Sequence, residues 1–299
     1  MIEFVEVGPR DGLQNEKLQI ATSDKLLLIG RALDFGARRI EVASFVNPVK
    51  VPQMADAEAV CAGLPQRSDA TYIGLVLNAR GAGRALATGR IDQLGAVAAA
   101  SDAFGMANQG QTSAGSIAAV AEIAALTRRA GKTVQATIAV AFGCPFSGEI
   151  PASRVVAMAR ELAGLGLEEV ALADTIGVAD PARVAALVGQ VQAAVAPLPV
   201  RVHFHNTRGT GLANVWAAIG AGASVVDGSL GGLGGCPFAP GAAGNVASED
   251  VAYMLERAGI ETGLDLGAMI AANHWLAEVM GRKLPGMAAQ APPFPAALA

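Results

Sequence analysis

Short β-rich runs alternate along this chain with longer segments that are rich in alanine and leucine. Short runs with β-branched residues predict strands, and the longer segments predict helices. The expected strands are Ile2–Val7, Arg39–Ala43, Thr71–Leu77, Gln93–Ala98, Thr133–Val140, Glu169–Ala173, Val200–His203 and Ser224–Asp227. The expected helices are Ser23–Phe35, Ala55–Gly63, Gly81–Thr88, Ser113–Ala130, Ala152–Gly164, Pro181–Val195, Gly211–Ala221 and Ser248–Ala258.

Eight strand–helix units predict an α/β fold in which a parallel sheet closes into a (β/α)₈ TIM barrel. A doubly wound open sheet is the competing architecture, but it more often uses fewer strands. The fourth unit is ambiguous because Gln93–Ala100 also fits a helix. Capping residues support the pattern. Ser23 and Asp180 stand at expected helix starts, and glycines follow three expected helix ends, at Gly36, Gly131 and Gly259.

The barrel is expected to occupy residues 1–263, with residues 264–299 as part of the same domain. Within that last part, Leu264–Met280 predicts an additional C-terminal helix. The proline-rich segment Pro292–Pro295 predicts a mobile tail beyond it.

Composition narrows the class of protein. Hydrophobic residues make up 52% of the 299 residues, yet charges interrupt every apolar run before it reaches the roughly 20 residues of a membrane span. The strand-like run directly after Met1 predicts no signal or transit peptide. A net charge of -4 and 4% aromatic residues argue against nucleic acid as a partner. Three cysteines without dense spacing fit a reduced cytoplasm, so we expect a cytoplasmic protein without a membrane partner.

Two of the three histidines lie together, at His203 and His205, where an expected strand ends. Residues two apart on a strand point to the same side, so both imidazoles face one way. Two converging neutral imidazoles are natural metal ligands. Two polar residues bonded to backbone at a strand end would give the same spacing.

Other polar residues also follow expected strands. In a TIM barrel the active site lies at the carboxyl ends of the strands, so these residues would share one rim. Each has a structural explanation of its own: Asp11 as a turn cap, Asp174 as a helix cap and Asn245 as an N-cap. Their joint placement favours a site. The residues concerned are Arg10, Asp11, Glu41, Ser44, Asp174, Thr175, His203, His205 and Asn245.

A glycine-rich segment, Gly231–Gly235, follows the last expected strand and precedes Cys236. The segment lacks the lysine and the serine or threonine of a P-loop, which argues against a phosphate cradle. Its glycines predict a hinged loop instead. A thiol carried beside a metal and an arginine would be suited to proton transfer, although loop cysteines are more often inert.

Several segments resemble the signatures of 3-hydroxy-3-methylglutaryl-CoA (HMG-CoA) lyases, and they occur in order from Glu6 to about Gly263. That family belongs to the metal-dependent (β/α)₈ lyases and aldolases, together with isopropylmalate and homocitrate synthases. The matching segments are Gly8–Glu16, Ser44–Val46, Val51–Asp56, Asp174–Val178, Gly232–Ala239, Gly244–Val246 and Glu249–Asp250.

The resemblance implies a retro-Claisen lyase that cleaves HMG-CoA, or a related hydroxyglutaryl-CoA, to acetyl-CoA and a 3-oxo acid. It implies a divalent metal held by Asp11, His203, His205 and Asn245. These oxygen and nitrogen ligands suit Mg²⁺ or Mn²⁺ better than a structural zinc. The family also suggests a homodimer.

The resemblance further assigns catalytic roles. Arg10 would stabilise the enolate oxygen, Cys236 would transfer a proton, and Glu41 would lie beside them. Either Asp11 or His203 would act as the base. The residues expected to contact the substrate or its CoA chain are Gln14, Lys17, Asn108, Asp174, Thr175 and Arg208.

The sequence departs from the family after the second histidine, and this leaves the acyl group open. Where the lyases usually carry Asp-Thr-Tyr-Gly, this chain has Asn206-Thr207-Arg208-Gly209. A lyase for a different branched 3-hydroxyacyl-CoA is therefore one alternative, and a Claisen-condensing synthase on the same barrel is another. The cysteine-loop signature favours the lyase. A non-catalytic metal-binding barrel would leave Arg10 and Cys236 unexplained.

Overall fold

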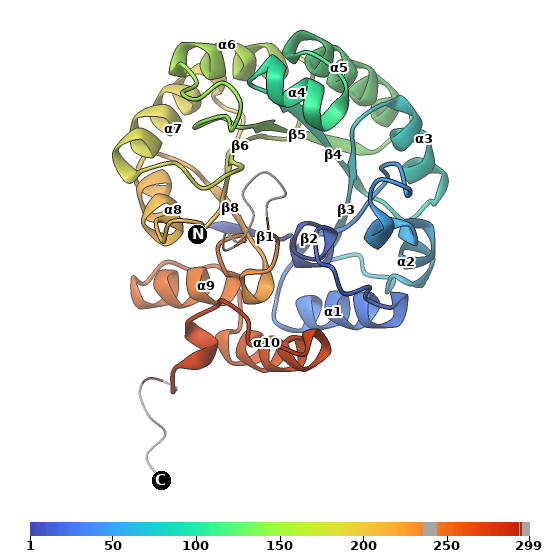
Figure 1. Ribbon diagram of the computed structural model, residues 1–299, viewed down its shortest axis with the longest axis vertical. Coiled ribbons are helices and arrows are strands. Elements are labelled where there is room, and N and C mark those ends of the chain that lie inside the picture. Colours follow the sequence, from blue (N-terminus) through green and yellow to red (C-terminus); the bar gives the residue numbers. More distant parts are fainter. Residues whose placement is uncertain (236–243, 293, 295–299) are drawn as a thin grey trace.

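The computed structural model describes residues 1–235, 244–292 and 294, and its centre is a closed barrel of eight parallel strands (Figure 1). The strands follow one another around the barrel in chain order, and β8 closes it by pairing with β1. This confirms the predicted TIM barrel. The strands are β1 Glu3–Glu6, β2 Arg39–Ser44, β3 Thr71–Val76, β4 Gln93–Ala99, β5 Thr133–Ala139, β6 Val170–Asp174, β7 Val200–Phe204 and β8 Val225–Gly228.

Helices surround the barrel and cover the outer face of the sheet (Figure 1). The apolar residues of strands and helices form the main core between these two layers. The helices are α1 Thr22–Asp34, α2 Ala57–Gly63, α3 Ala79–Ala87, α4 Asp102–Gln109, α5 Ser113–Arg129, α6 Ala152–Ala163, α7 Pro181–Val195, α8 Gly211–Gly220, α9 Ser248–Arg257 and α10 Leu266–Met280.

The fourth unit resolves as a strand, as predicted, but helix α4 was not predicted. Its signals were present: the Ser101 hydroxyl accepts from the Phe104 amide, and Gly110 ends the helix in the left-handed conformation. The segment is short, and the sequence pattern predicts only a connection between β4 and α5 there. A run of about two turns gives little periodicity.

Most of the predicted caps are correct. The Asp180 carboxylate accepts from the Ala182 and Arg183 amides at the start of α7. The predicted cap at Ser23 is wrong, because α1 begins one residue earlier and Ala21 takes the N-cap position without a side-chain bond. The three glycines predicted to end helices all have positive φ, just after α1, α5 and α9: Gly36, Gly131 and Gly259.

The interior of the barrel is unusually polar. Its separate apolar cluster consists of Val5, Val7, Ile73 and Val225. TIM barrels mostly fill this space with branched apolar residues. Here Arg201 on β7 reaches across to Gln135 and Thr137 on β5. Ionic and amide groups therefore fill much of the space inside the sheet.

The C-terminal helix α10 lies outside the barrel beside α1 and α9 (Figure 1). Arg31 of α1 stacks over the Trp275 ring at 4.7 Å. His274 is exposed on the same helix, as predicted. The expected tail falls partly outside the described residues, and so does the predicted glycine-rich loop, which is described up to Gly235 but not at Cys236. No described helix is long and apolar enough to cross a membrane.

Glu6, at the end of β1, forms hydrogen bonds with the segment that follows the last strand, β8. Its side chain is fully buried and accepts from the Gly8 and Leu230 amides and from the Ser248 hydroxyl. Burial raises the pKa of Glu6 from its ordinary value of 4.5 to about 7, although these hydrogen bonds oppose the shift. The folded protein therefore binds a proton here between those two pH values, and the unfolded chain does not.

The contribution of Glu6 to folding stability should consequently fall as pH rises from about 5 to about 8, because the raised folded-state pKa makes ionisation costly. Glu6→Gln keeps an acceptor oxygen for both amides, and its Nε2 can donate to the Ser248 hydroxyl oxygen in place of accepting from that hydroxyl. We expect it to be more stable than the original chain at about pH 8, by up to roughly 3 kcal/mol, and equal to it at about pH 5. Urea unfolding at both pH values measures this. Glu3→Gln, at the exposed end of the same strand, is the control, and an equal response in both variants would contradict the prediction.

Candidate active site

A cavity of about 1060 Å³ opens at the carboxyl ends of the barrel strands. Residues at or near these strand ends line it, among them Val7, Ala139 and Ala173. TIM barrels place their active sites at this end. The cavity is therefore the candidate active site, and its polar residues can be placed one by one.

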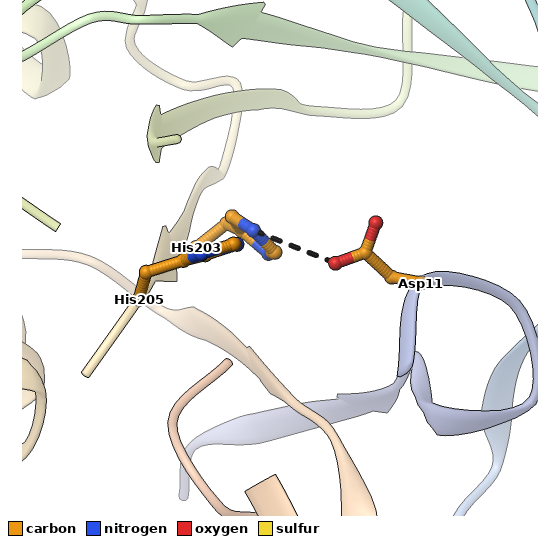
Figure 2. A group of neighbouring side chains, drawn as sticks. All are labelled: Asp11, His203 and His205. Atoms are coloured by element: carbon orange, nitrogen blue, oxygen red, sulfur yellow. Dashed lines mark ion pairs between the residues drawn. The ribbon is translucent and has the colours of Figure 1, made fainter. Parts of the chain in front are cut away.

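Asp11, His203 and His205 converge inside this cavity (Figure 2). Each offers one ligand atom, and these atoms all lie within 4.8 Å of one another. The histidines project from the end of β7, and Asp11 projects toward them from the turn after β1 (Figure 2). The Val7 carbonyl fixes that turn by accepting from three successive amides, those of residues 10 to 12. Strand alternation thus presents two imidazoles on one side, and barrel closure brings the carboxylate to them.

Asn245 reaches the same point through the backbone. It forms an antiparallel bridge with His205, and its amide nitrogen donates to Asp11 Oδ2 at 2.8 Å and to the Leu233 carbonyl at 3.0 Å. Gly234 permits this approach, because a Cβ there would lie 2.4 Å from the Asn245 amide nitrogen. Those two bonds leave the Asn245 side-chain oxygen available.

The donor set fits a divalent cation. Asn245 Oδ1 and His205 Nδ1 are buried and have no hydrogen-bond partner among the described residues. Orphaned buried acceptors are costly unless something occupies them. Two imidazoles, a carboxylate and an amide oxygen form a mixed nitrogen and oxygen set of the kind that holds a divalent cation.

Arg10 lies beside Asp11, His203 and His205, which form the candidate metal-ligand cluster. It is 9% exposed and contacts two carboxylates. Its Nε donates to Glu41 Oε1 and its Nη1 to Asp11 Oδ1. Burial opposes its charge, but Asp11 and Glu41 raise the pKa of Arg10 above its usual range. Burial would likewise raise the pKa of Asp11, yet the Arg10 charge and then the two imidazoles hold it well below its usual range. Arg10 is thus a fixed cation whose orientation is set before any ligand arrives.

The two histidines differ in their surroundings. Burial disfavours a charge on both. For His203, the neighbouring Asp227 carboxylate outweighs burial and raises the pKa. For His205, burial and then the charge of His203 lower the pKa to about 4. His205 is therefore neutral near neutral pH, as a metal ligand must be.

Asp227 was not among the residues singled out from the sequence. Its Oδ1 lies 2.8 Å from His203 Nδ1, which leaves His203 Nε2 facing Asp11 at 3.9 Å. A signal was available, because Asp227 ends the last predicted strand and so belongs to the same rim. No motif of the family resemblance included it.

The remaining predicted residues divide into two groups. Gln14, Asn108 and Thr175 line the cavity with the residues above. Three others are absent from its lining. Lys17 is exposed, Asp174 accepts from the Val178 and Ala179 amides, and Arg208 donates to the carbonyls of Ile176 and Gly177. Their predicted substrate contacts stay predictions, and Cys236 lies outside the described residues.

The outer wall of the cavity carries basic side chains that sequence analysis did not identify. Lys50 and Arg80 are exposed there and form no ion pair with any described residue, whereas Arg84 is neutralised by Glu58 at 2.8 Å. Arg80 lies in the first turn of α3, which Asn78 caps. The cavity therefore runs from a metal-ligand cluster to a basic rim.

Comparison with known proteins agrees with this geometry. The HMGL-like family model matches residues 1–275. An (R)-citramalyl-CoA lyase from Chloroflexus aurantiacus is 42% identical over 98% of this chain and 95% of its own. A 3-hydroxy-3-isohexenylglutaryl-CoA/hydroxymethylglutaryl-CoA lyase from Pseudomonas aeruginosa is 41% identical over 97% and 96%. Among solved structures, an HMG-CoA lyase from Acinetobacter baumannii in complex with coenzyme A and 3-methylmalate has a TM-score of 0.93 at 40% identity, covering 97% of this chain and 95% of that one.

The cluster makes a direct prediction about metal binding. His205→Ala removes a ligand and should weaken Mn²⁺ binding by more than about a hundredfold, beyond the loss seen when only an outer partner of a ligand is removed. The free-ion EPR signal of Mn²⁺, titrated with metal-free protein, measures the affinity. His274→Ala, on the exposed face of α10, is the matched control and should bind as the original chain does. Equal binding by both variants would remove His205 from the ligand set.

Proposed function

The chain belongs to the HMGL-like family and is a carbon–carbon lyase, and from this premise we propose that it cleaves HMG-CoA, or a closely related 3-hydroxyacyl-CoA, to acetyl-CoA and a 3-oxo acid. The observation that carries the proposal is the convergence of Asp11, His203 and His205 beside Arg10 in one cavity. Such a cavity is suited to acidify a hydroxyl and to stabilise the electron pair that carbon–carbon cleavage then leaves on the thioester.

We assign the metal to Asp11, His203, His205 and Asn245, and we propose that the ion is Mg²⁺ or Mn²⁺. Two buried polar atoms without a partner among the described residues, His205 Nδ1 and Asn245 Oδ1, support this assignment. When bound, such an ion supplies Lewis-acid chemistry, polarising a substrate oxygen so that its proton is lost more easily.

Arg10 is proposed to stabilise the enolate. Cleavage converts the C3 hydroxyl to a carbonyl and leaves the bonding electron pair on C2, where it delocalises onto the thioester oxygen. A donor already aimed at such a developing charge needs no reorganisation at the moment of reaction. Glu41 and Asp11 hold the Arg10 guanidinium from two sides, which provides that fixed aim.

Two proton transfers complete the reaction. The hydroxyl proton would pass to Asp11 or His203, which lie on the same side of the cavity. Arg10 favours the ionised form of Asp11, and Asp227 raises the proton affinity of His203. The C2 carbanion would then be protonated by the Cys236 thiol, a role that rests on the family resemblance.

The basic rim is suited to the other end of the substrate. The CoA nucleotide carries phosphate groups, and Lys50 and Arg80 place two cations at the mouth of the cavity. Phosphate is favoured by such cations and by the start of a helix, and Arg80 provides both on α3. A thioester reaching from this rim to the metal-ligand cluster would place its acyl group beside Arg10.

A second candidate substrate is favoured by a specific observation, because the Chloroflexus aurantiacus relative is named for (R)-citramalyl-CoA and the Pseudomonas aeruginosa relative for a longer branched chain. The acyl end of this cavity is lined by small side chains, including Ala139 and Ala173. That lining does not by itself select a methyl group at C3.

The proposal is tested with a panel of thioesters: HMG-CoA, both enantiomers of citramalyl-CoA and a 3-hydroxy-3-alkylglutaryl-CoA with a longer chain. We expect acetyl-CoA release from at least one, restored by Mg²⁺ or Mn²⁺ after treatment with a chelator. The ranking of kcat/KM identifies the acyl group. Release that persists in the chelator would exclude metal-dependent cleavage, and condensation of acetyl-CoA without cleavage would favour the synthase.

The role of Arg10 predicts a separation of catalysis from metal binding. Arg10→Gln should lower kcat on the order of 10²–10³-fold, the usual cost of one oxyanion donor, and the loss should persist at saturating Mn²⁺, because Arg10 contacts Asp11 but is not itself a ligand. Arg10→Lys keeps the charge and should recover part of the rate. Turnover within about tenfold of the original in Arg10→Gln would show that the enolate is stabilised elsewhere.

A further inference from the structure

A continuous chain of charged groups crosses the barrel interior behind His203. His203 Nδ1 lies 2.8 Å from Asp227 Oδ1, and Asp227 Oδ2 lies 3.4 Å from Arg201 Nη1. Arg201 Nε lies 3.1 Å from Glu169 Oε1, and Arg39 binds both Glu169 oxygens at 2.8 and 3.0 Å. The chain therefore runs from the candidate metal ligand to the start of β2 at the opposite end of the barrel.

The burial of these groups calls for an explanation beyond stability. The side chains of Arg201, Asp227 and Glu169 are each 3% exposed. Taking charges out of water costs several kcal/mol per ion, and well-packed apolar residues in their place are often equally or more stabilising. TIM barrels commonly fill this space with valine, isoleucine and leucine. The ion pairs are thus a costly way to fill the interior.

We propose that Asp227 and Arg201 are positioning residues that fix the tautomer of His203 and so prepare its Nε2 for the metal. The inference rests on the metal site of the proposed function and adds two residues that act on it without touching the substrate. An ionised carboxylate only accepts, so Asp227 requires a hydrogen on Nδ1 of His203. In the neutral ring Nε2 then carries the free lone pair, and it is Nε2 that faces Asp11.

Arg201 holds the other oxygen of Asp227, because a guanidinium can only donate and therefore faces an acceptor. Its guanidinium is held by Glu169 on one side and by Gln135 and Thr137 on another, so it cannot swing away from Asp227. It therefore pairs with one Asp227 oxygen and leaves the other turned toward His203. Partners of this kind, one bond behind a metal ligand, commonly change metal affinity about 10–100-fold.

The pair makes a sharp prediction for Asp227→Asn. Arg201 must face the side-chain oxygen of the new asparagine, which turns the amide NH₂ toward His203. That NH₂ needs an acceptor, so His203 should switch to the tautomer with its hydrogen on Nε2. We expect Mn²⁺ affinity to fall about 10–100-fold, because the lone pair then points away from the site.

The tautomer can be read without metal or substrate. The chain has three histidines, so ¹⁵N-histidine labelling gives few signals. Long-range ¹H–¹⁵N correlation distinguishes the two neutral tautomers once the pH has been raised past the titration of the ring, which the same spectra follow. The original chain should show hydrogen on Nδ1 of His203, and Asp227→Asn should show it on Nε2. Retention of the Nδ1 hydrogen together with unchanged Mn²⁺ affinity would overturn the proposal.

Arg201→Met and Arg39→Met are the matched pair that separates positioning from general disruption of the interior. Both remove a guanidinium from the same chain of ion pairs, but only Arg201 touches Asp227. Mn²⁺ affinity should fall about tenfold in Arg201→Met, recover in part in Arg201→Lys, and stay within about twofold in Arg39→Met. Equal losses in both methionine variants would mean a merely structural role.

The test does not depend on turnover. Asp227→Asn is nearly isosteric and decides the proposal if Arg201→Met does not fold. A chain that has the Nδ1 tautomer and binds Mn²⁺, yet cleaves no thioester of the panel, would overturn the proposed function and leave this inference standing. A chain that cleaves HMG-CoA but carries the hydrogen of His203 on Nε2 would overturn this inference and leave the proposed function standing.

Discussion

The balance of charge inside the barrel is the constraint on which the rest of the structure depends. Apart from the exposed Glu3, the ion pairs that meet there join four carboxylates, those of Asp11, Glu41, Glu169 and Asp227, to three guanidinium groups, those of Arg10, Arg39 and Arg201. A buried group of charges is stable only when it is balanced. The interior is short of positive charge at the end where the imidazoles lie, so it favours a cation at that end. Binding of a divalent ion and the ion-pair network behind it thus have a common electrostatic basis.

The fold was predictable from the sequence because its signals are local and repeated. Each β-rich run followed by an Ala-rich helix is one unit, and eight of them leave few alternatives to a closed barrel. Errors fell where signals are short. Helix α4 occupies only Asp102–Gln109, and α3 starts before its predicted first residue because Asn78 caps it. The polar interior was not foreseen, since nothing in a strand such as Val200–Phe204 says whether Arg201 faces water or a carboxylate across the barrel.

The residues of the site could be predicted where they follow a strand end or belong to a motif of the family. Asp11, His203, His205 and Asn245 do converge, although Asp11 and Asn245 are far apart in sequence. What could not be read from the sequence is the pairing of side chains in three dimensions. Asp174 shows this: it lies at the end of β6, but its carboxylate accepts hydrogen bonds from two backbone amides and does not line the cavity. Arg208 likewise binds two carbonyls in the adjoining loop, and the basic rim arises from exposed residues with no motif.

The ligand cluster has a consequence for how the protein comes to exist. Its first member, Asp11, is made near the beginning of synthesis, and its last, Asn245, emerges only after all eight strands. A ribosome-bound intermediate therefore carries an isolated carboxylate, then a carboxylate with two imidazoles on an unclosed sheet, and never a finished coordination sphere. An ion that binds only the native state stabilises it by mass action. Such an ion would therefore stabilise completed chains, and chains that end before Asn245 would lack that stabilisation.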